Sequence, residues 1–406
     1  MCSPSRAVVV ISPFPSRDQH ERLSGVAEYS QRLVEHLPHS VRVEVVAQKG
    51  ARNATFPNAI VSEVWSVGKI RAPLQIAYHL VSRRPEGVHF QHEFRILGSL
   101  IGTYGLVFVL VLLRLRRIRV VTTLHCVVPR DQVGRSFWQG DDRRRRELLY
   151  LLVLRVSYRL LVLASDELVV HDDFFAGVLV NDYHVSRSKI NVIPHGANSG
   201  SVESDVGTSA DPSYGSTRPA ALDSDGPRIL ALGFLASYKR PELLAELLED
   251  GGIPGAHYTF AVGFNPQLDS STYRARYASL RQRVELAGAQ WLGYVADDLL
   301  DNLLADTDVL VLAYTAPIGA SGVGALAQAH GVALCWSREL APLFGEGPTC
   351  FSWSSSELGD AVRAALIRKR AGSASIAQAV GLYAPWDEVA NATVFLWKDR
   401  LKSNSH

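Results

Sequence analysis

The stretch from Val309 to Leu334 constrains the fold of this chain most strongly. It begins as a buried-strand pattern over Val309–Tyr314, passes through a turn of proline, glycine and serine, becomes a small-residue helix from about Gly322, and returns to a strand after Gly331. This order predicts a βαβ unit, whose helix N-terminus presents free N–H groups at the carboxyl edge of a parallel sheet. Such an edge stabilises anions, and phosphate is the ligand that it indicates.

Strand and helix patterns alternate along the rest of the chain. Strands are expected over residues 7–12, 42–47, 87–91, 120–124, 167–170, 189–193, 228–233, 258–262 and 290–292. Helices are expected from about Gly25 to Leu37 and from Pro241. The alternation predicts an α/β fold with two doubly wound, Rossmann-like domains that face each other across a ligand-binding cleft.

A change in composition divides the chain. Residues 199–226 consist largely of Ser, Gly, Asp, Pro and Thr, too polar to bury a core, and are predicted to form a linker. The predicted domains are therefore residues 1–198 and 227–385. Residues 386–406 begin with a helix-compatible pattern, and we expect this helix to pack back on the first domain.

The two halves differ in charge. Residues 1–198 contain 26 Lys and Arg against 17 Asp and Glu, a net charge of +9, whereas the remainder contains 16 against 23, a net charge of −7. A basic half is suited to nucleic acid or to an anionic membrane surface. Nucleic acid is disfavoured because no aromatic-rich basic module accompanies the charge. Arg143–Arg146 form either a solvated helix face or a contact with anionic lipid.

An apolar segment and the cysteines bear on the cellular location. Ile96–Leu113 is uncharged, but glycines dilute its first half, so we expect a buried or membrane-skimming helix rather than a span. The four cysteines lie far apart without zinc-ligand spacing, which predicts a reducing compartment and no structural metal. The apolar run at residues 7–12 ends in prolines and indicates a first strand, not a signal peptide.

Two predicted loops of the second domain carry groups suited to phosphate. Gly233 ends a strand, and Lys239 follows in the loop before a helix begun by Pro241, where its ammonium could meet a diphosphate. The alternative is a solvated surface lysine. In the corresponding turn, Ser321–Val323, glycine permits close backbone approach, and the serine either binds phosphate or caps the helix.

Polar side chains also end the strands of the first domain. His125 follows a strand and should face the cleft, although a structural histidine is the alternative. His92 and Glu93 follow another strand, where they either position acceptor hydroxyls, with one acting as a base, or brace the sheet edge. For His171 and His195 we expect roles in helix capping or hinge geometry.

The start of the first helix offers a further phosphate contact. Gly25 could let a donor phosphate approach the backbone, although an ordinary helix start capped by Ser24 explains the pair equally well. The GxGxxG pattern is missing, which disfavours a nicotinamide dinucleotide.

In combination, these segments resemble retaining glycosyltransferases of the GT-B fold, family four, over essentially the whole chain. The matching segments are SGVAEYSQRL, VHFQHEF, VVTTLH, ELVVHDDF, KINVIPHG, ILALGFLASYKRPELL, the turn through Ser321, Gly322 and Val323, and WDEVA. Their order and spacing carry the resemblance more than any one of them. It implies a metal-independent hexosyltransferase without a cofactor, because the nucleotide sugar is a co-substrate.

The resemblance also implies roles for particular residues. The implied donor-binding residues are Gly25, Gly233, Lys239, Ser321, Gly322 and Val323; the implied catalytic residues are His125, at the donor sugar, and Lys239, at the diphosphate; and the acceptor would lie in the first domain, near His92 and Glu93. In such enzymes the sugar keeps its anomeric configuration and the departing phosphate deprotonates the acceptor hydroxyl. Catalysis is then mostly positioning and charge stabilisation.

The chain departs from the family pattern at three positions. Phe234 stands where many members carry an arginine, and Ile318 and Leu326 stand where many carry two glutamates. The leading hypothesis is a transferase of glycan, glycolipid or natural-product glycoside synthesis, acting on a sugar, lipid-linked or small-molecule acceptor. It would be cytoplasmic, with peripheral association at the inner face of the cell membrane. The alternatives are a nucleotide-sugar epimerase of the same fold and a catalytically degenerate partner subunit.

Overall fold

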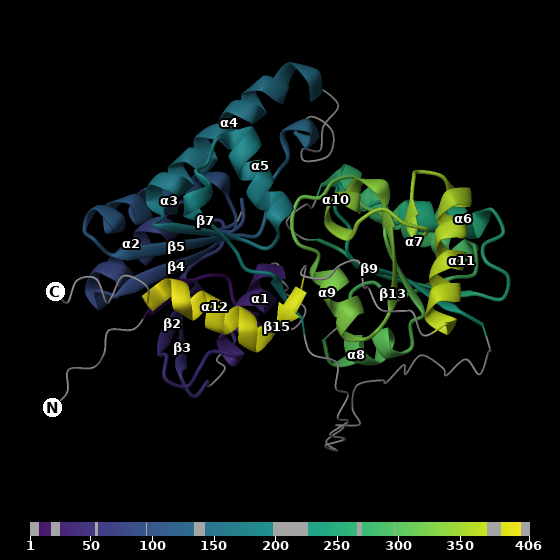
Figure 1. Cartoon of the computed structure of the whole chain (residues 1–406), viewed down its shortest axis with the longest axis horizontal. Coiled ribbons are helices and arrows are strands. Elements are labelled where there is room, and N and C mark those ends of the chain that lie inside the picture. The colour runs from purple at the N-terminus through teal and green to yellow at the C-terminus, as the bar shows by residue number, and fades with distance from the viewer. Residues whose placement is uncertain are drawn as a thin grey trace.

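The computed structural model shows two α/β domains side by side (Figure 1). It describes residues 8–17, 25–52, 56–94, 96–133, 143–197, 226–265, 270–295, 297–371 and 383–398. Within these residues the first sheet has the strand order β3-β2-β1-β4-β5-β6-β7 and the second the order β11-β10-β9-β12-β13-β14. The expected α/β architecture with two doubly wound parallel sheets is confirmed. The strands of the two sheets fall on either side of the predicted linker, of which residues 199–225 lie outside the described residues.

The strands follow the predicted alternation closely. Those of the first sheet are β1 (Val8–Ile11), β2 (Val43–Gln48), β3 (Ala59–Trp65), β4 (Gly87–His92), β5 (Arg119–Leu124), β6 (Glu167–Val170) and β7 (Ile190–Val192). Those of the second are β9 (Arg228–Phe234), β10 (His257–Gly263), β11 (Gln290–Trp291), β12 (Val309–Leu312), β13 (Ala333–Ser337) and β14 (Cys350–Phe351). Within the described residues, all strand pairings in the two sheets are parallel, so the carboxyl ends of each set of strands share one edge.

Helices cover both faces of each sheet. In the first domain, α2 (Ala72–Arg83), α3 (Leu100–Leu115), α4 (Arg143–Ala164) and α5 (Asp173–Tyr183) lie on one face, and α1 (Gly25–Glu35) and α12 (Trp386–Lys398) on the other (Figure 1). In the second, α6 (Glu242–Glu249), α7 (Ser271–Leu286) and α11 (Ser355–Arg370) cover one face, and α8 (Asp297–Ala305), α9 (Gly322–Ala329) and α10 (Ala341–Phe344) the other. One apolar cluster continues from the α2–α5 side of the first domain to the α8–α10 side of the second.

The end of the chain returns to the first domain. β15 (Tyr383–Pro385) pairs in parallel with β8 (His195–Ala197), the last described strand before the second domain. After β15, α12 packs against α1 and β5, where Trp386 and Trp397 are 6% and 5% exposed. The Trp397 indole Nε1–H donates to the Nδ1 of His89, 3.2 Å away. The first domain is therefore built from both ends of the sequence.

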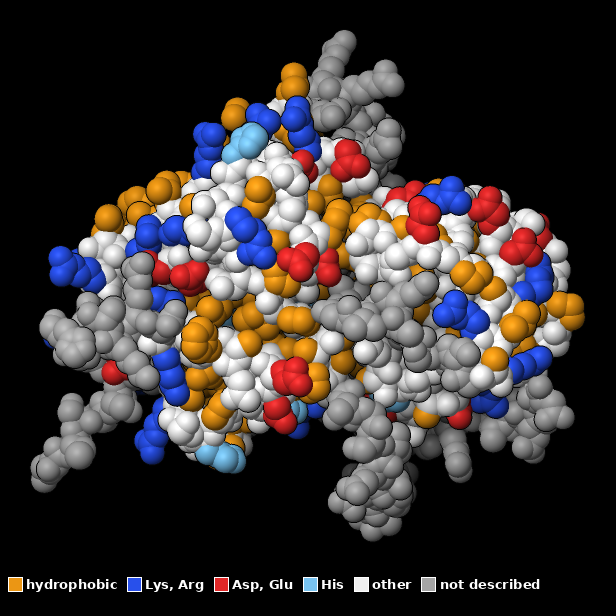
Figure 2. All heavy atoms as spheres, in the orientation of Figure 1, with side chains coloured by type: hydrophobic (Ala, Val, Ile, Leu, Met, Phe, Trp, Pro, Cys, Tyr) orange, Lys and Arg blue, Asp and Glu red, His pale blue; other side chains and the backbone are white. Residues whose placement is uncertain are grey.

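The apolar segment at Ile96–Leu113 falls largely within α3. Leu106, Leu110 and Leu113 are buried against the sheet, whereas Ile101 and Phe108 are exposed on the outer face. Among the described residues, no helix has the length and apolar character that crossing a bilayer requires. Figure 2 shows apolar side chains along the upper-left margin of the first domain, where Figure 1 places α2, α3 and α4.

Removal of one indole tests how strongly α12 holds the first domain together. Trp397→Ala leaves a cavity and removes the donor to the buried His89, so we expect the free energy of unfolding to fall by about 3–5 kcal/mol. Phe395→Ala on the same helix, where the ring is 63% exposed, should change it by less than about 0.5 kcal/mol. Urea titrations of both variants measure the difference, and equal effects would contradict the packing.

Candidate active site

The carboxyl edges of the two sheets meet directly. The backbone N–H of Val127, beyond β5, donates to the Ile318 carbonyl, 2.8 Å away in the loop between β12 and α9. A Cβ at the next residue, Gly319, would overlap the carbonyl oxygen of His125, so the two backbones approach with no side chain between them. The Tyr383 hydroxyl, from β15, donates to the Ser321 carbonyl at 3.0 Å. Groups at the strand ends of both domains are thereby brought to one place.

Backbone contacts between two neighbouring loops fix the position of Lys239. The chain after β9 runs beside the chain after β12, with the Thr315 N–H donating to the Tyr238 carbonyl and the Arg240 N–H to the Ala313 carbonyl, each at 2.7 Å. The Nζ of Lys239 consequently lies 5.0 Å from the ring centroid of Tyr314, within cation–π range. Burial acts to lower the pKa of the Lys239 ammonium, but Tyr314 and Tyr238 raise that pKa by more, so the lysine is a cation at neutral pH.

Arg276, on α7, holds the Lys239 loop from outside. Its guanidinium donates to the carbonyls of Ala236 and Lys239, at 3.0 and 2.8 Å, and pairs with the Glu242 carboxylate of α6. A planar guanidinium with several donors suits this bridging of carbonyls and a carboxylate. Sequence analysis missed Arg276 because its partners lie 34 to 40 residues away in the chain.

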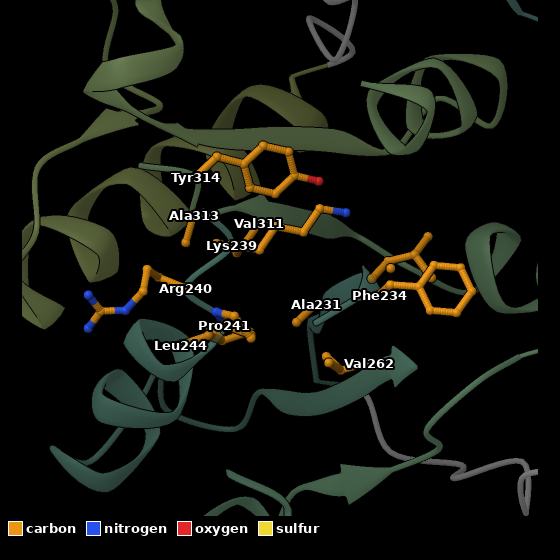
Figure 3. A pocket seen from close by; sticks show the side chains of 12 residues that line it. Ala231, Phe234, Lys239, Arg240, Pro241, Leu244, Val262, Val311, Ala313 and Tyr314 are labelled. Carbon is orange, nitrogen blue, oxygen red and sulfur yellow. The ribbon is translucent and has the colours of Figure 1, made fainter. Parts of the chain in front are cut away.

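A pocket opens beside Lys239 at the carboxyl ends of β9 and β12 (Figure 3). In this view the Lys239 ammonium and the Tyr314 hydroxyl point toward the side where Phe234 lies, whereas Arg240 points the opposite way. The Phe234 ring stacks on Tyr294, with centroids 6.0 Å apart and planes 13° from parallel. The pocket thus combines the Lys239 ammonium with an aromatic wall. Phe234 makes this wall at the position where the resemblance leads one to look for a second cation.

Gly233 permits the close approach of the groups around this pocket. Its φ is +115°, a conformation that glycine adopts without strain. A Cβ there would lie 3.0 Å from the Lys239 Nζ and 3.4 Å from a methyl group of Val323, at the start of α9. The structure therefore brings three predicted donor-binding residues, Gly233, Lys239 and Val323, into one group.

The N-terminus of α9 borders the same group. The Ser321 side chain accepts a hydrogen bond from the Gly324 N–H at 3.1 Å, so its hydroxyl caps the helix. That is the helix-capping alternative raised for this serine. Helix geometry leaves the first N–H groups, those of Gly322 and Val323, without partners inside the helix, and they favour an anion.

His125 belongs to a hydrogen-bonded series of buried groups. The Nδ1 of His171 is 3.0 Å from the Ile193 carbonyl, which only accepts, so this nitrogen carries the proton. The Nε2 of His171 then accepts from the Nδ1 of His125, 3.3 Å away. The Nε2 of His125 is then unprotonated and lies 2.7 Å from the Gln91 side-chain oxygen Oε1, which also only accepts, so the amide must turn to bring its NH₂ to this position. Turning the Gln91 amide NH₂ toward His125 also gives a partner to an amide nitrogen that otherwise lacks one.

Burial keeps these imidazoles neutral. It lowers the pKa of His171 to about 3 and of His195 to about 4, and burial together with the neighbouring His171 holds the pKa of His125 well below its usual value. The Tyr29 ring, on α1, contacts the rings of all three histidines and of Trp386, with centroids 4.7–5.2 Å apart. We call these five side chains the Tyr29 cluster. Sequence analysis assigned His171 and His195 to capping and hinge roles, and missed Tyr29.

His195 connects this cluster to the second domain. Its Nδ1 is 2.8 Å from the Gly196 carbonyl and carries the proton, which leaves Nε2 as an acceptor. A Cβ on Gly322 would lie 3.9 Å from that Nε2, so the imidazole contacts the first turn of α9.

The candidate acceptor residues separate in the structure. His92 is 1% exposed, and its ring contacts Phe90 and Phe94 edge-on in the core, where an acceptor does not reach it. Glu93 is partly exposed, and burial raises the pKa of its carboxyl. Burial raises the pKa of the Cys126 thiol and of the Tyr238 hydroxyl, and the charge of Glu93 is a smaller cause that acts in the same direction on both.

Gly25 begins α1 with an exposed backbone, and a Cβ at this position would meet nothing within 4 Å. The predicted Ser24 cap lies outside the described residues. Within the residues that the structure describes, no group of three His, Cys, Asp or Glu side chains is arranged to hold a metal ion.

Comparison with known proteins gives a match to a family model over part of the chain and a set of structures with a similar fold. Residues 23–200 match the model of Glycosyltransferase Family 4. The structure is similar to sucrose-phosphate synthase from Thermosynechococcus elongatus, with a TM-score of 0.72, 13% identity, and coverage of 98% of this chain and 100% of that chain. It is similar to Anabaena HepE in complex with UDP and glucose, with a TM-score of 0.63, 13% identity, and coverage of 98% and 99%.

A third similar structure is the trehalose-6-phosphate protein from E. coli bound with UDP-2-fluoro glucose, with a TM-score of 0.59, 13% identity, and 98% coverage of each chain. No curated protein sequence matches the chain. At such low identity the three structures establish the two-domain fold, and the family match covers the first domain.

The buried neutral imidazoles predict sensitivity to acid. Their folded pKa values lie below the unfolded value near 6.5, so the unfolded chain binds more protons below that pH and the folded state loses stability as the pH falls. For each such histidine, the free energy of unfolding falls by up to about 1.4 kcal/mol for each pH unit between its unfolded and folded pKa values. The melting temperature should therefore fall between about pH 6.5 and about pH 4, and His171→Gln should show a shallower fall.

The exposed His39 provides the control. His39→Gln should keep the pH dependence of the unmodified chain. An unchanged pH dependence in His171→Gln would show that His171 does not titrate in this way.

Proposed function

We propose that this chain is a glycosyltransferase that moves a sugar from a nucleotide-sugar donor to an acceptor hydroxyl with retention of configuration. Residues 23–200 match the model of Glycosyltransferase Family 4, and the whole chain has the GT-B fold. The observation that carries the proposal is the convergence of Lys239, Gly233 and the start of α9 at the carboxyl edge of the second sheet. A cation and a helix N-terminus together suit a diphosphate.

The aromatic wall supports a nucleotide rather than a simple phosphate. The Phe234 ring lies on the side of the pocket toward which Lys239 points, and Tyr294 stacks on that ring. An aromatic face is suited to a nucleobase or a sugar ring. The similar HepE structures hold UDP or UDP-glucose. We therefore propose a nucleoside diphosphate sugar as the donor.

In the transfer step, positively polarised groups of this chain would stabilise the charge that develops on the departing diphosphate. As the bond from the anomeric carbon to the diphosphate oxygen breaks, negative charge develops on the diphosphate, and Lys239 with the first N–H groups of α9 would stabilise it. The acceptor oxygen bonds the same carbon on the same face, and its proton passes to the departing phosphate. These groups supply the positive charge that a metal ion gives in other transferases, so the proposal includes neither metal nor cofactor.

His125 and Glu93 would line the sugar side of the site. Both ring nitrogens of His125 already have partners, Gln91 and His171, so we propose that its ring shapes the sugar site. A sugar hydroxyl could bind its Nε2 by replacing the Gln91 amide as partner. Glu93 directly follows β4 at the carboxyl edge of the first sheet, and we propose that it holds the acceptor hydroxyl.

Removal of the cation tests the donor site. Lys239→Ala should weaken binding of nucleoside diphosphates by roughly ten- to a hundredfold, the loss expected for a charge-assisted hydrogen bond, and lower the rate of nucleoside diphosphate release. Lys239→Arg should recover part of the affinity, and Lys398→Ala, at an exposed lysine of α12, should change nothing. Calorimetric titration measures the affinities. If no nucleoside diphosphate binds or stabilises the unmodified chain, a catalytically degenerate subunit replaces the transferase.

Neutralising the acceptor-side carboxyl tests the other half of the site. Glu93→Gln should raise the acceptor KM while leaving the nucleoside diphosphate Kd unchanged, because the carboxyl faces the acceptor side. Since burial raises its carboxyl pKa, we expect activity of the unmodified enzyme to increase as the pH rises through that pKa, and the variant to lack this increase. A change in donor Kd with an unchanged acceptor KM would contradict the assignment.

A further inference from the structure

The outer face of α2, α3 and α4 is apolar although it faces solvent. α3 packs between α2 and α4 on one side of the first sheet. In the described part of the chain, twelve of the twenty exposed large apolar side chains lie on these three helices. Six that represent the face are Leu74 and Tyr78 on α2, Phe108 and Leu112 on α3, and Leu152 and Val156 on α4, each at least 45% exposed.

The spacing of these exposed apolar side chains indicates one continuous apolar surface rather than isolated exposed residues. On each helix the exposed pair is four residues apart, one turn along the same side. The opposite side of α3 carries apolar residues too, buried against the sheet. A helix that only covers a sheet has a polar outer side, and a contiguous exposed apolar patch indicates an interaction surface.

Exposed arginines border this face. They are Arg71 at the start of α2, Arg84 at its end, and Arg116 and Arg117 at the end of α3. The ends of α2 and α3 lie at the same sheet edge, because each helix leads from one strand to another in parallel. Nearby Arg83 and Arg114 have carboxylate partners, whereas for these four the described residues show no ion pair.

Two of these arginines occupy backbone positions that favour glycine. Arg84 has a φ of 49° and Arg117 a φ of 63°, and within the described residues one further non-glycine residue, His184, has a positive φ. A left-handed residue after a helix is usually glycine or asparagine, and a long side chain there costs free energy. Glycine or asparagine would end these helices at a lower cost in free energy. The presence of arginine at both positions therefore indicates that the two charges have another role.

We propose that the outer face of α2, α3 and α4 docks on an anionic phospholipid bilayer. The apolar side chains would enter the boundary between headgroups and acyl chains, and the arginines would pair with lipid phosphates. Charge favours this occupant over a second copy of the chain, because the bordering arginines complement lipid phosphates, whereas a two-fold dimer through this face would bring like-charged arginines of both copies near one another. The proposal does not depend on the transferase activity.

Sedimentation with vesicles tests the proposal on the full chain. The protein should sediment with vesicles of phosphatidylcholine mixed with phosphatidylglycerol, less so as salt is raised, and weakly with phosphatidylcholine alone. Phe108→Glu should abolish sedimentation. Replacing both Arg116 and Arg117 by Gln should weaken binding by roughly fivefold per arginine and reduce its salt dependence.

Matched controls come from other faces of the molecule. Phe395, on α12, has the same 63% exposure as Phe108, so Phe395→Glu should sediment like the unmodified chain. Arg370→Gln, at the end of α11, should also have no effect. Unchanged circular dichroism and melting temperature would show that Phe108→Glu is folded.

Three results would overturn the proposal. The first is that the unmodified protein does not sediment with anionic vesicles at low salt. The second is loss of binding in Phe395→Glu rather than in Phe108→Glu, which would move the docking surface to α12. The third is a dimer by light scattering that Phe108→Glu makes monomeric, without vesicle binding by the unmodified chain.

Discussion

The burial of neutral polar rings around Tyr29 is the constraint on which the rest of the structure depends. Its ring contacts side chains from the ends of β5 and β6, from β8 and from α12, so segments more than 350 residues apart in the chain meet at one phenol. A buried imidazole is stable here only when it is neutral and hydrogen-bonded. The tautomer of each histidine therefore determines that of the next. The Ile193 carbonyl determines the protonated nitrogen of His171, which determines that of His125, which in turn determines the orientation of the Gln91 amide.

The same arrangement relates the two domains. His195 belongs to the Tyr29 cluster and contacts the first turn of α9, and Tyr383 donates to the Ser321 carbonyl in that turn. The helix N-terminus proposed for the diphosphate is thus supported by residues of the segments that connect the domains. A change in the angle between the domains would alter the cluster and the phosphate site together.

The sequence contains enough to predict the two sheets, but not how their edges meet. Apolar runs that end in Gly233, His125 or Glu93 predict strands and the side chains at their carboxyl ends, because that pattern is local. The edge strand β3 was missed since its burial is mixed, with Ile60 exposed and Trp65 buried. His92 was misplaced because one residue along a strand reverses the face of the sheet. Arg276 and Tyr29 act through contacts distant in sequence, which no local pattern reveals.

Gly319 has a consequence for the dimensions of the site. With the His125 carbonyl against its Cα, the spacing between the two domains at this point equals the thickness of two backbones. A side chain at this position would overlap the His125 carbonyl oxygen and force the two backbones apart. The close approach of the two sheet edges therefore depends on the absence of one methyl group at this position.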